Sequence, residues 1–87
     1  MKIDLELEVK KIIAEVAEYE PEEVDLDANI YSQLGVDSIK AIEIAVLIEK
    51  KFKVSVREEQ LASIVTGRQI KQMLERALKK KKKKKLN

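Results

Sequence analysis

The sequence contains neither histidine nor cysteine, and these two absences exclude much of the chemistry that proteins perform. A serine nucleophile is normally activated by a neighbouring histidine, and closed zinc sites are commonly built on cysteine thiolates. Without cysteine there is also no disulfide framework and no thiol on the chain. We therefore expect neither an enzyme active site nor a metal site.

Proline, glycine and aromatic residues are also scarce. The 87 residues include one proline, two glycines and three aromatic side chains. No apolar run approaches the roughly 18 residues that a membrane-spanning helix needs, and no signal peptide opens the sequence. Helix-forming residues dominate what remains, which favours a helical bundle over a sandwich or barrel. We expect one small domain in the cytoplasm.

The formal net charge of +2 combines two parts of opposite sign. Residues 1–78 hold eleven Lys plus Arg against sixteen Asp plus Glu, a difference of −5, whereas residues 79–85 are seven consecutive lysines. Because like charges repel, a run of this kind is typical of a disordered tail. The predicted organisation is therefore an acidic folded domain over 1–78 and a basic, disordered tail over 79–87.

Hydrophobic periodicity predicts an all-α fold, a small four-helix bundle of three longer helices and one short helix. We expect the first helix over about 5–18 with Asp4 as its N-cap, the second over 38–52, the short third over 57–63 and the last from Thr66. Thr66 and Gln69 form a capping-box pattern. A long loop over 19–36 joins the first two helices, and four spaced apolar residues are expected to attach it to the core: Val24, Leu26, Ile30 and Leu34.

The second helix carries more apolar residues than one buried face requires. One stripe of them is assigned to the core: Ala41, Ile44, Ala45, Ile48 and Phe52. Ile42 and Val46 lie four and eight residues after Ser38 and share its face, so they should be exposed if Ser38 is exposed. The alternative is a broad buried face in a small bundle.

Ser38 stands at the predicted start of this helix, directly after an N-cap candidate, Asp37. No G-x-S-x-G motif surrounds it, so Ser38 is a better candidate for being modified than for attacking a substrate. A phosphate ester at this position would face the free N–H groups and the positive end of the helix dipole. The simpler interpretation is that Asp37 or Ser38 only caps the helix.

The stretch Leu34-Gly35-Val36-Asp37-Ser38-Ile39, followed by Glu43, Leu47-Ile48-Glu49 and Phe52, resembles the acyl carrier protein family. The resemblance runs from about Ile3 to Leu78. It implies that a phosphopantetheinyl transferase esterifies Ser38 with 4′-phosphopantetheine, with Asp37 beside the attachment point. The arm's thiol would then hold acyl groups as thioesters for acyl-transferring enzymes.

The resemblance also implies two surfaces around the second helix. Partner enzymes would recognise an exposed face made of Ile39, Ile42, Glu43, Val46 and Glu49. A bound acyl chain would fold back among apolar residues between the helices: Ile39, Ile44, Ile48, Val56, Leu61, Ile64 and Ile70.

The sequence departs from the family pattern at Lys40, Lys50 and Lys51, where members are often acidic, and at Ile39, where leucine is usual. The three lysines favour a dedicated set of partners, in a specialised fatty-acid, lipid or polyketide-type pathway, over a general role in fatty-acid synthesis. We expect a monomer.

The alternative function is that of a small helical domain that binds proteins, nucleic acid or membranes through its lysine tail. The acidic balance of residues 1–78 and the few aromatics argue against nucleic acid. A weak contact of Lys79 to Lys85 with an anionic membrane is left open.

Overall fold

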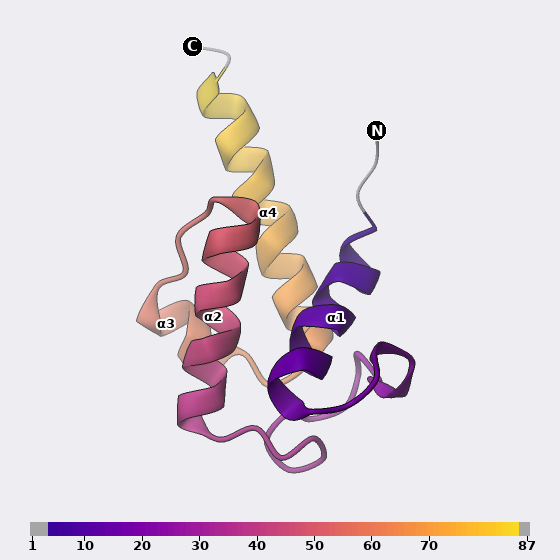
Figure 1. Ribbon diagram of the computed structural model, residues 1–87. Coiled ribbons are helices and arrows are strands. Elements are labelled where there is room, and N and C mark those ends of the chain that lie inside the picture. Colours follow the sequence, from indigo (N-terminus) through magenta and orange to yellow (C-terminus); the bar gives the residue numbers. More distant parts are fainter. Residues whose placement is uncertain (1–3, 86–87) are drawn as a thin grey trace.

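The computed structural model describes residues 4–85, and over that range the fold is all-helical. The elements are α1 (Leu5–Ala17), the short 3-10 helix η1 (Pro21–Glu23), α2 (Ser38–Phe52), α3 (Glu58–Ser63) and α4 (Gly67–Lys85) (Figure 1). A single isolated bridge pairs Asn29 with Thr66. The predicted fold class, three longer helices and a short one with a long loop after the first, is confirmed.

The helix starts follow from the capping residues that the sequence contains. Asp4 accepts a hydrogen bond from the Leu7 N–H at 3.2 Å, which satisfies one of the free donors of the first turn of α1. At the start of α4 the Thr66 N–H donates to Gln69 Oε1 at 3.0 Å, and the Gln69 N–H donates to Thr66 Oγ1 at 3.3 Å. The capping box predicted for these two residues is therefore confirmed.

The end of α4 differs from the prediction. A disordered tail was expected from residue 79, but α4 continues to Lys85. Lysine is a good helix former, and positive charge is favourable near a helix C-terminus, so both effects oppose the repulsion between the lysines. The remaining two residues of the predicted tail, 86 and 87, lie outside the described residues.

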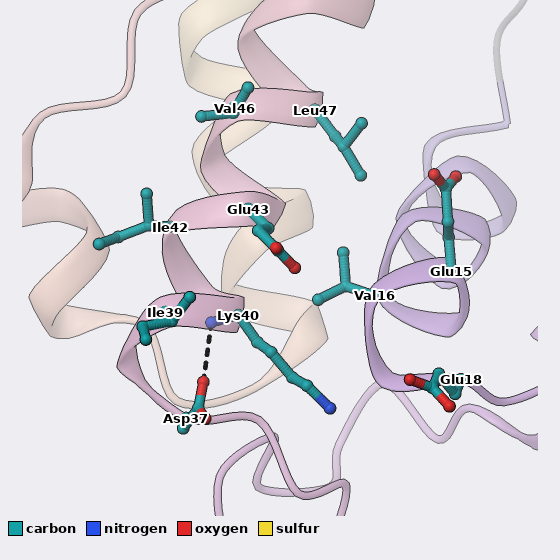
Figure 2. Close-up of a pocket in the computed structure, with 10 residues that line it drawn as sticks. All are labelled: Glu15, Val16, Glu18, Asp37, Ile39, Lys40, Ile42, Glu43, Val46 and Leu47. Atoms are coloured by element: carbon teal, nitrogen blue, oxygen red, sulfur yellow. Dashed lines mark hydrogen bonds between the residues drawn. The ribbon is translucent and has the colours of Figure 1, made fainter.

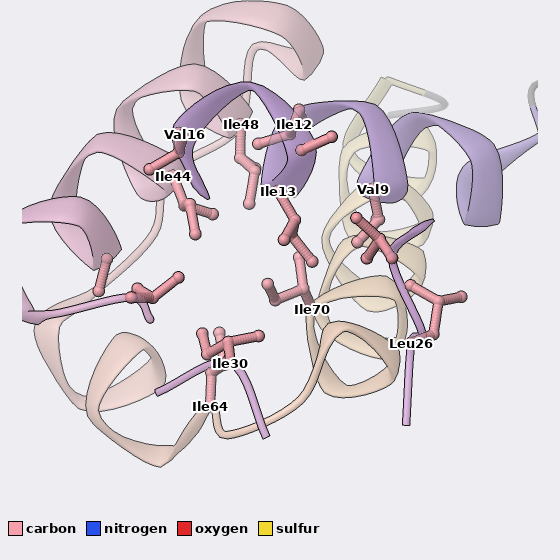
Figure 3. Packing of buried hydrophobic residues seen from close by; sticks show 14 of the residues in the cluster. Val9, Ile12, Ile13, Val16, Leu26, Ile30, Ile44, Ile48, Ile64 and Ile70 are labelled. Carbon is pink, nitrogen blue, oxygen red and sulfur yellow. The ribbon is translucent and has the colours of Figure 1, made fainter. Parts of the chain in front are cut away.

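One apolar core joins α1, α2, α4 and the long loop (Figure 3). The expected stripe of α2 is buried in full: Ala41, Ile44, Ala45, Ile48 and Phe52. The four apolar residues expected to attach the loop are also buried, with at most 8% of the side chain exposed, and Val36 joins them at 3%. The loop is thus part of the core, which fixes where α2 begins.

Two backbone hydrogen bonds join the loop to the start of α4. The Ile30 N–H donates to the Val65 carbonyl and the Arg68 N–H donates to the Leu26 carbonyl, each at 2.9 Å. Gly67 lies at this junction, where a Cβ would be 2.8 Å from Leu26 Cδ2 and 2.9 Å from Ile13 Cδ1. A residue without a side chain is therefore what lets α4 approach the loop and α1 so closely.

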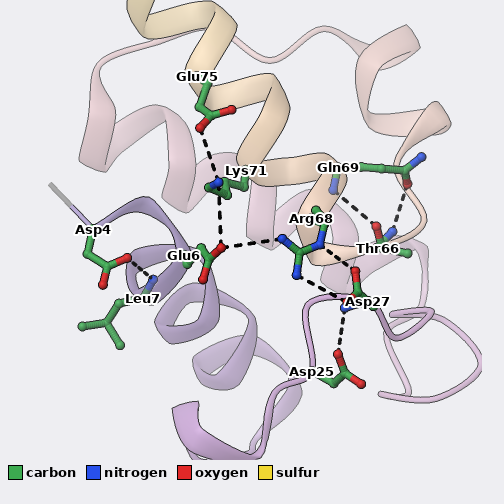
Figure 4. A network of polar contacts seen from close by, with 10 residues as sticks. All are labelled: Asp4, Glu6, Leu7, Asp25, Asp27, Thr66, Arg68, Gln69, Lys71 and Glu75. Carbon is green, nitrogen blue, oxygen red and sulfur yellow. Dashed lines mark hydrogen bonds and ion pairs between the residues drawn. The ribbon is translucent and has the colours of Figure 1, made fainter.

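Ion pairs reinforce the same junction on its exposed side (Figure 4). Arg68 Nε lies 2.6 Å from Asp27 Oδ1, and Arg68 Nη1 lies 3.6 Å from Glu6 Oε2. The hydrogen bond from Arg68 holds the pKa of the Asp27 carboxyl below its ordinary value and raises the pKa of the guanidinium. Arg68 of α4 thereby forms ion pairs with both the loop and α1.

Within the described part of the chain, no helix combines the length and apolar character that crossing a bilayer demands.

Candidate functional site

Ser38 is the first residue of α2, and its side chain is exposed. Three neighbouring features hold it there. Val36 is buried and donates its N–H to the Ile30 carbonyl at 2.9 Å, Gly35 adopts a left-handed conformation with φ of 72°, and Asp37 accepts a hydrogen bond from the Lys40 N–H at 2.8 Å. The chain therefore turns sharply at a buried anchor and presents the Ser38 hydroxyl to solvent at the positive end of the helix dipole.

The exposed side of α2 forms one wall of a groove whose other wall is the end of α1 (Figure 2). The groove has a volume of about 670 Å³. It is lined by Glu15, Val16, Glu18, Asp37, Ile39, Lys40, Ile42, Glu43, Val46 and Leu47. In Figure 2, Lys40, Glu43 and Leu47 point toward α1, whereas Ile42 points away from it.

The apolar residues predicted to lie on the partner-facing side of α2 are exposed, among them Ile42 and Val46, which were predicted to share the face of Ser38. Ile39 is 67% exposed, Ile42 55% and Val46 43%. The alternative of a broad buried face on α2 is therefore wrong. Exposed isoleucine and valine in a row, next to carboxylates, are typical of a surface that another protein covers.

The residues expected to surround an acyl chain are brought together, with one exception. An apolar cavity between α2, α3 and α4 is lined by Ile30, Ala41, Ile44, Ala45, Ile48, Val56, Leu61, Ile64, Ile70 and Met73. Six of the seven predicted residues are among them. Ile39 is not, because it lies two positions before Ala41, the first residue of the buried stripe, and the structure places it on the outer face instead. The cavity has a volume of about 10 Å³, the room of a single water molecule.

The comparison with known families decides what this arrangement belongs to. The family model described as "Phosphopantetheine attachment site" matches residues 8–74. The chain is a member of the acyl carrier protein family. The match contains the long loop, the exposed serine and most of the bundle. The prosthetic group of this family, as the description of the family model states, is phosphopantetheine.

Individual acyl carrier proteins match over 59 residues, 68% of this chain. The acyl carrier protein of Rhodococcus erythropolis is 41% identical, and the matched part is 65% of its length. Those of Sulfurovum sp. and Wolinella succinogenes are 30% and 29% identical, over 79% and 78% of their lengths. The chain thus spans about two thirds of the first relative and over three quarters of the other two.

In this member of the family, two charged residues of α2 that were expected to face partners also make contacts with other parts of the same molecule. Glu49 is half-buried, and its Oε2 accepts a hydrogen bond from the Val56 N–H at 2.7 Å, which fixes the chain between α2 and α3. Lys51 Nζ lies 2.5 Å from Glu8 Oε1 and so joins α2 to α1. Of the three unusual lysines, Lys40 lines the groove and Lys50 is exposed outside it.

Sequence reasoning missed the contribution of α1 to the groove. Glu15, Val16 and Glu18 were given no role in the site. The available signal was charge: between Ile12 and Ile39 the sequence has eight carboxylates and no Lys or Arg. What the sequence could not show is that the last turn of α1 lies beside the first turns of α2.

Proposed function

We propose that this protein carries acyl groups as thioesters on a 4′-phosphopantetheine arm attached to Ser38 Oγ. The observation that supports this most directly is the exposed Ser38 hydroxyl directly after the Asp37 N-cap, within the matched attachment-site region. When bound, the arm supplies the thiol that the chain itself lacks. The protein then acts as a substrate of other enzymes and not as a catalyst.

The residues around Ser38 suit a phosphodiester at that position. The first N–H groups of a helix have no partner within the helix and favour an anion. Lys40, two residues further on, adds a positive charge near the same turn, and no side chain covers Ser38. Asp37 keeps the turn in place by capping α2, which in our proposal is its role in modification.

Partners are proposed to dock on the exposed face of α2. Ile39, Ile42 and Val46 would supply apolar contacts, and Glu43 would supply charge. These partners are the phosphopantetheinyl transferase and the acyl-transferring enzymes of the pathway. Because Glu49 is engaged with the Val56 N–H, its contribution to docking is expected to be smaller than that of Glu43.

The acyl chain is proposed to enter the cavity between α2 and α3 only when the bundle opens. A cavity of about 10 Å³ cannot hold an alkyl chain as it stands. The element expected to move is α3, which has six residues, none of them buried. Within α3, half-buried Leu61 packs against the core, and half-buried Val56 before the helix and buried Ile64 at its C-cap hold its two ends. A helix with so few buried side chains is expected to open at a low free-energy cost.

Lys40 and Lys50 support a specialised fatty-acid, lipid or polyketide-type pathway, since both add positive charge to the helix that partners are proposed to read. We further propose that the protein works in the cytoplasm, where the transferase and coenzyme A are available to it, and that it does so as a monomer.

The attachment is tested by intact mass. The protein is incubated with coenzyme A and a promiscuous phosphopantetheinyl transferase, and we expect the mass to rise by one phosphopantetheine group. Ser38→Ala should abolish this gain, whereas Ser55→Ala, at another exposed serine, should leave it unchanged. A wild-type protein that gains no mass, or a Ser38→Ala variant that still does, would overturn the proposal.

A further inference from the structure

Charge in this protein is separated along the molecule as well as along the sequence. The eight carboxylates between Ile12 and Ile39 belong to the last turns of α1, the long loop and the N-cap of α2. The seven lysines at 79–85 are the last residues of α4. Figure 1 places the loop and the start of α2 at one end of the molecule and the last turns of α4 at the opposite end. The longest dimension of the molecule is 42 Å.

The end of α4 also extends beyond the packed bundle. Among the residues of α4 whose burial the structure describes, the last fully buried one is Leu74, and Leu78 is only half-buried. In Figure 1, the following turns project past the end of α2. At a rise of about 1.5 Å per residue, residues 79–85 place seven charges within roughly 10 Å of helix. Bringing so many like charges together is unfavourable unless an anionic surface compensates them.

We propose that the lysine-bearing end of α4 binds anionic lipid surfaces and that it does so end-on, with Ser38 at the far end of the molecule. Clusters of four to eight basic residues are attracted by the negative potential of a membrane that contains anionic lipids. The attraction requires no pocket and no apolar insertion, which fits a segment composed of lysine alone.

The composition of the segment favours a lipid surface over nucleic acid. Residues 79–85 contain no arginine and no aromatic residue. Arginine is the side chain that recognises guanine and phosphate in a fixed geometry, and aromatic side chains stack on bases. Lysine is a compact, strongly hydrated charge on a flexible stem, suited to a diffuse layer of head groups. Sequence-independent binding to DNA is therefore the competing outcome of the test.

The separation of charge determines the orientation. At physiological ionic strength, interactions between exposed charges are screened over about 8 Å, which is much shorter than the molecule. With α4 pointing at the surface, the lysines are attracted while the carboxylates of the loop lie too far away to be repelled. Lying flat would bring Glu20 to Asp27 closer to the anionic lipids. The bound protein should therefore keep Ser38 away from the membrane and accessible to enzymes.

Binding is tested by co-sedimentation with vesicles of phosphatidylcholine alone or mixed with phosphatidylglycerol. We expect binding only to the mixed vesicles, and at least a tenfold loss of affinity between low and moderate salt. Replacing all seven lysines at 79–85 with glutamine keeps a good helix former and should abolish binding, whereas Lys50→Gln should not. Binding to neutral vesicles, or binding that survives the seven replacements, would refute the proposal. So would binding to a short DNA duplex under the same conditions with no binding to the mixed vesicles.

Orientation is tested separately, and the absence of cysteine makes the labelling specific. Ser38→Cys and Lys79→Cys variants each receive one fluorophore, and the vesicles carry a head-group quencher. End-on binding predicts strong quenching at position 79 and little at position 38, while equal quenching at both would show that the orientation is wrong. Neither experiment needs the phosphopantetheine arm, so its outcome is independent of the proposed carrier function.

Discussion

Asp37 and Ser38 are adjacent residues with different proposed roles, and the capping hydrogen bond is the reason we expect both to matter. Asp37 accepts the Lys40 N–H, so the direction in which α2 starts is fixed at the residue before the serine. Ser38 contributes only its exposed hydroxyl, and the chain lacks histidine, the side chain that most often serves as a general base. In the proposed modification the reactivity comes from the transferase, while this protein supplies position.

Removing the cap should weaken the protein and slow its modification. We expect Asp37→Ala to lower the free energy of unfolding by about 1 kcal/mol, because the first turn of α2 loses its acceptor, while Asp37→Asn should lose much less. Urea titration followed by circular dichroism measures this. The rate of phosphopantetheine transfer should fall more for Ala than for Asn, and equal stability of all three proteins would show that Asp37 is not an effective cap.

A substitution at Val46, the exposed valine of α2, tests partner docking separately from folding. Val46→Asp adds a charge to a side chain that is 43% exposed, so we expect the free energy of unfolding to change by less than about 1 kcal/mol. The KM for the carrier protein in phosphopantetheine transfer should rise several-fold. Ile44→Asp is the matched control, because Ile44 is 2% exposed and a buried charge should unfold the protein. If Val46→Asp also unfolds it, Val46 belongs to the core.

At the scale of the elements, the close packing of α4 on the loop and α1 depends on Gly67. We expect Gly67→Ala to lower the free energy of unfolding by about 1 kcal/mol, because the added methyl group would displace the ends of the Leu26 and Ile13 side chains, which lie under 3 Å from its position. Urea titration measures the loss.

Gly35 is the informative comparison, since its Cβ position is open and only its positive φ is demanding. Gly35→Asn should be better tolerated than Gly35→Ala, because asparagine adopts the left-handed region more readily.

A Gly67→Ala protein as stable as the wild type would mean that α4 can shift away from the loop without loss of stability.

The elements that could be predicted from the sequence are those whose signals are local. The caps at Asp4, Asp37 and Thr66, the buried stripe of α2 and the exposure of Val46 follow from spacing along one helix. The contacts that could not be predicted join residues far apart in sequence. Lys51 with Glu8 is one such contact, and the pairing of Asp27 with Arg68 is another.

The candidate site divides in the same way. Ser38 and the outer face of α2 were predicted because they lie within a few residues of each other. The wall that α1 adds to the groove was not, because it depends on how two helices pack. Ile39 was expected both on the partner-facing surface and in the acyl-chain pocket. The structure places it on the outer face only, because it does not lie on the buried stripe of α2.

At the scale of the whole molecule, two ion pairs join segments that the apolar core already brings together. Lys51 connects α2 to Glu8 of α1, and Arg68 connects α4 to Asp27 of the loop. Hydrogen bonds from these cations hold the pKa of the Glu8 carboxyl below its ordinary value of 4.5 and that of Asp27 below 3.8. The stability of the protein should therefore depend on pH in the acidic range.

The sign follows from the direction of both pKa shifts. A carboxyl whose pKa is lower in the folded protein stabilises the fold above its unfolded pKa, and this contribution disappears as the pH falls through the folded value. We expect the free energy of unfolding to be nearly constant from pH 7 down to about 5 and to decrease below the ordinary values of 4.5 and 3.8. Urea titrations at a series of pH values measure it.

The double variant Glu8→Gln/Asp27→Asn assigns this dependence to the two pairs. It should be less stable than the wild type at pH 7 and should lose less stability on acidification, so that the two curves converge at low pH. The control is Glu15→Gln/Glu22→Gln, which changes two exposed carboxylates that form no ion pair among the described side chains. If this control flattens the curve as much as the double variant does, the acid sensitivity arises from the general excess of carboxylates and not from the links between the helices.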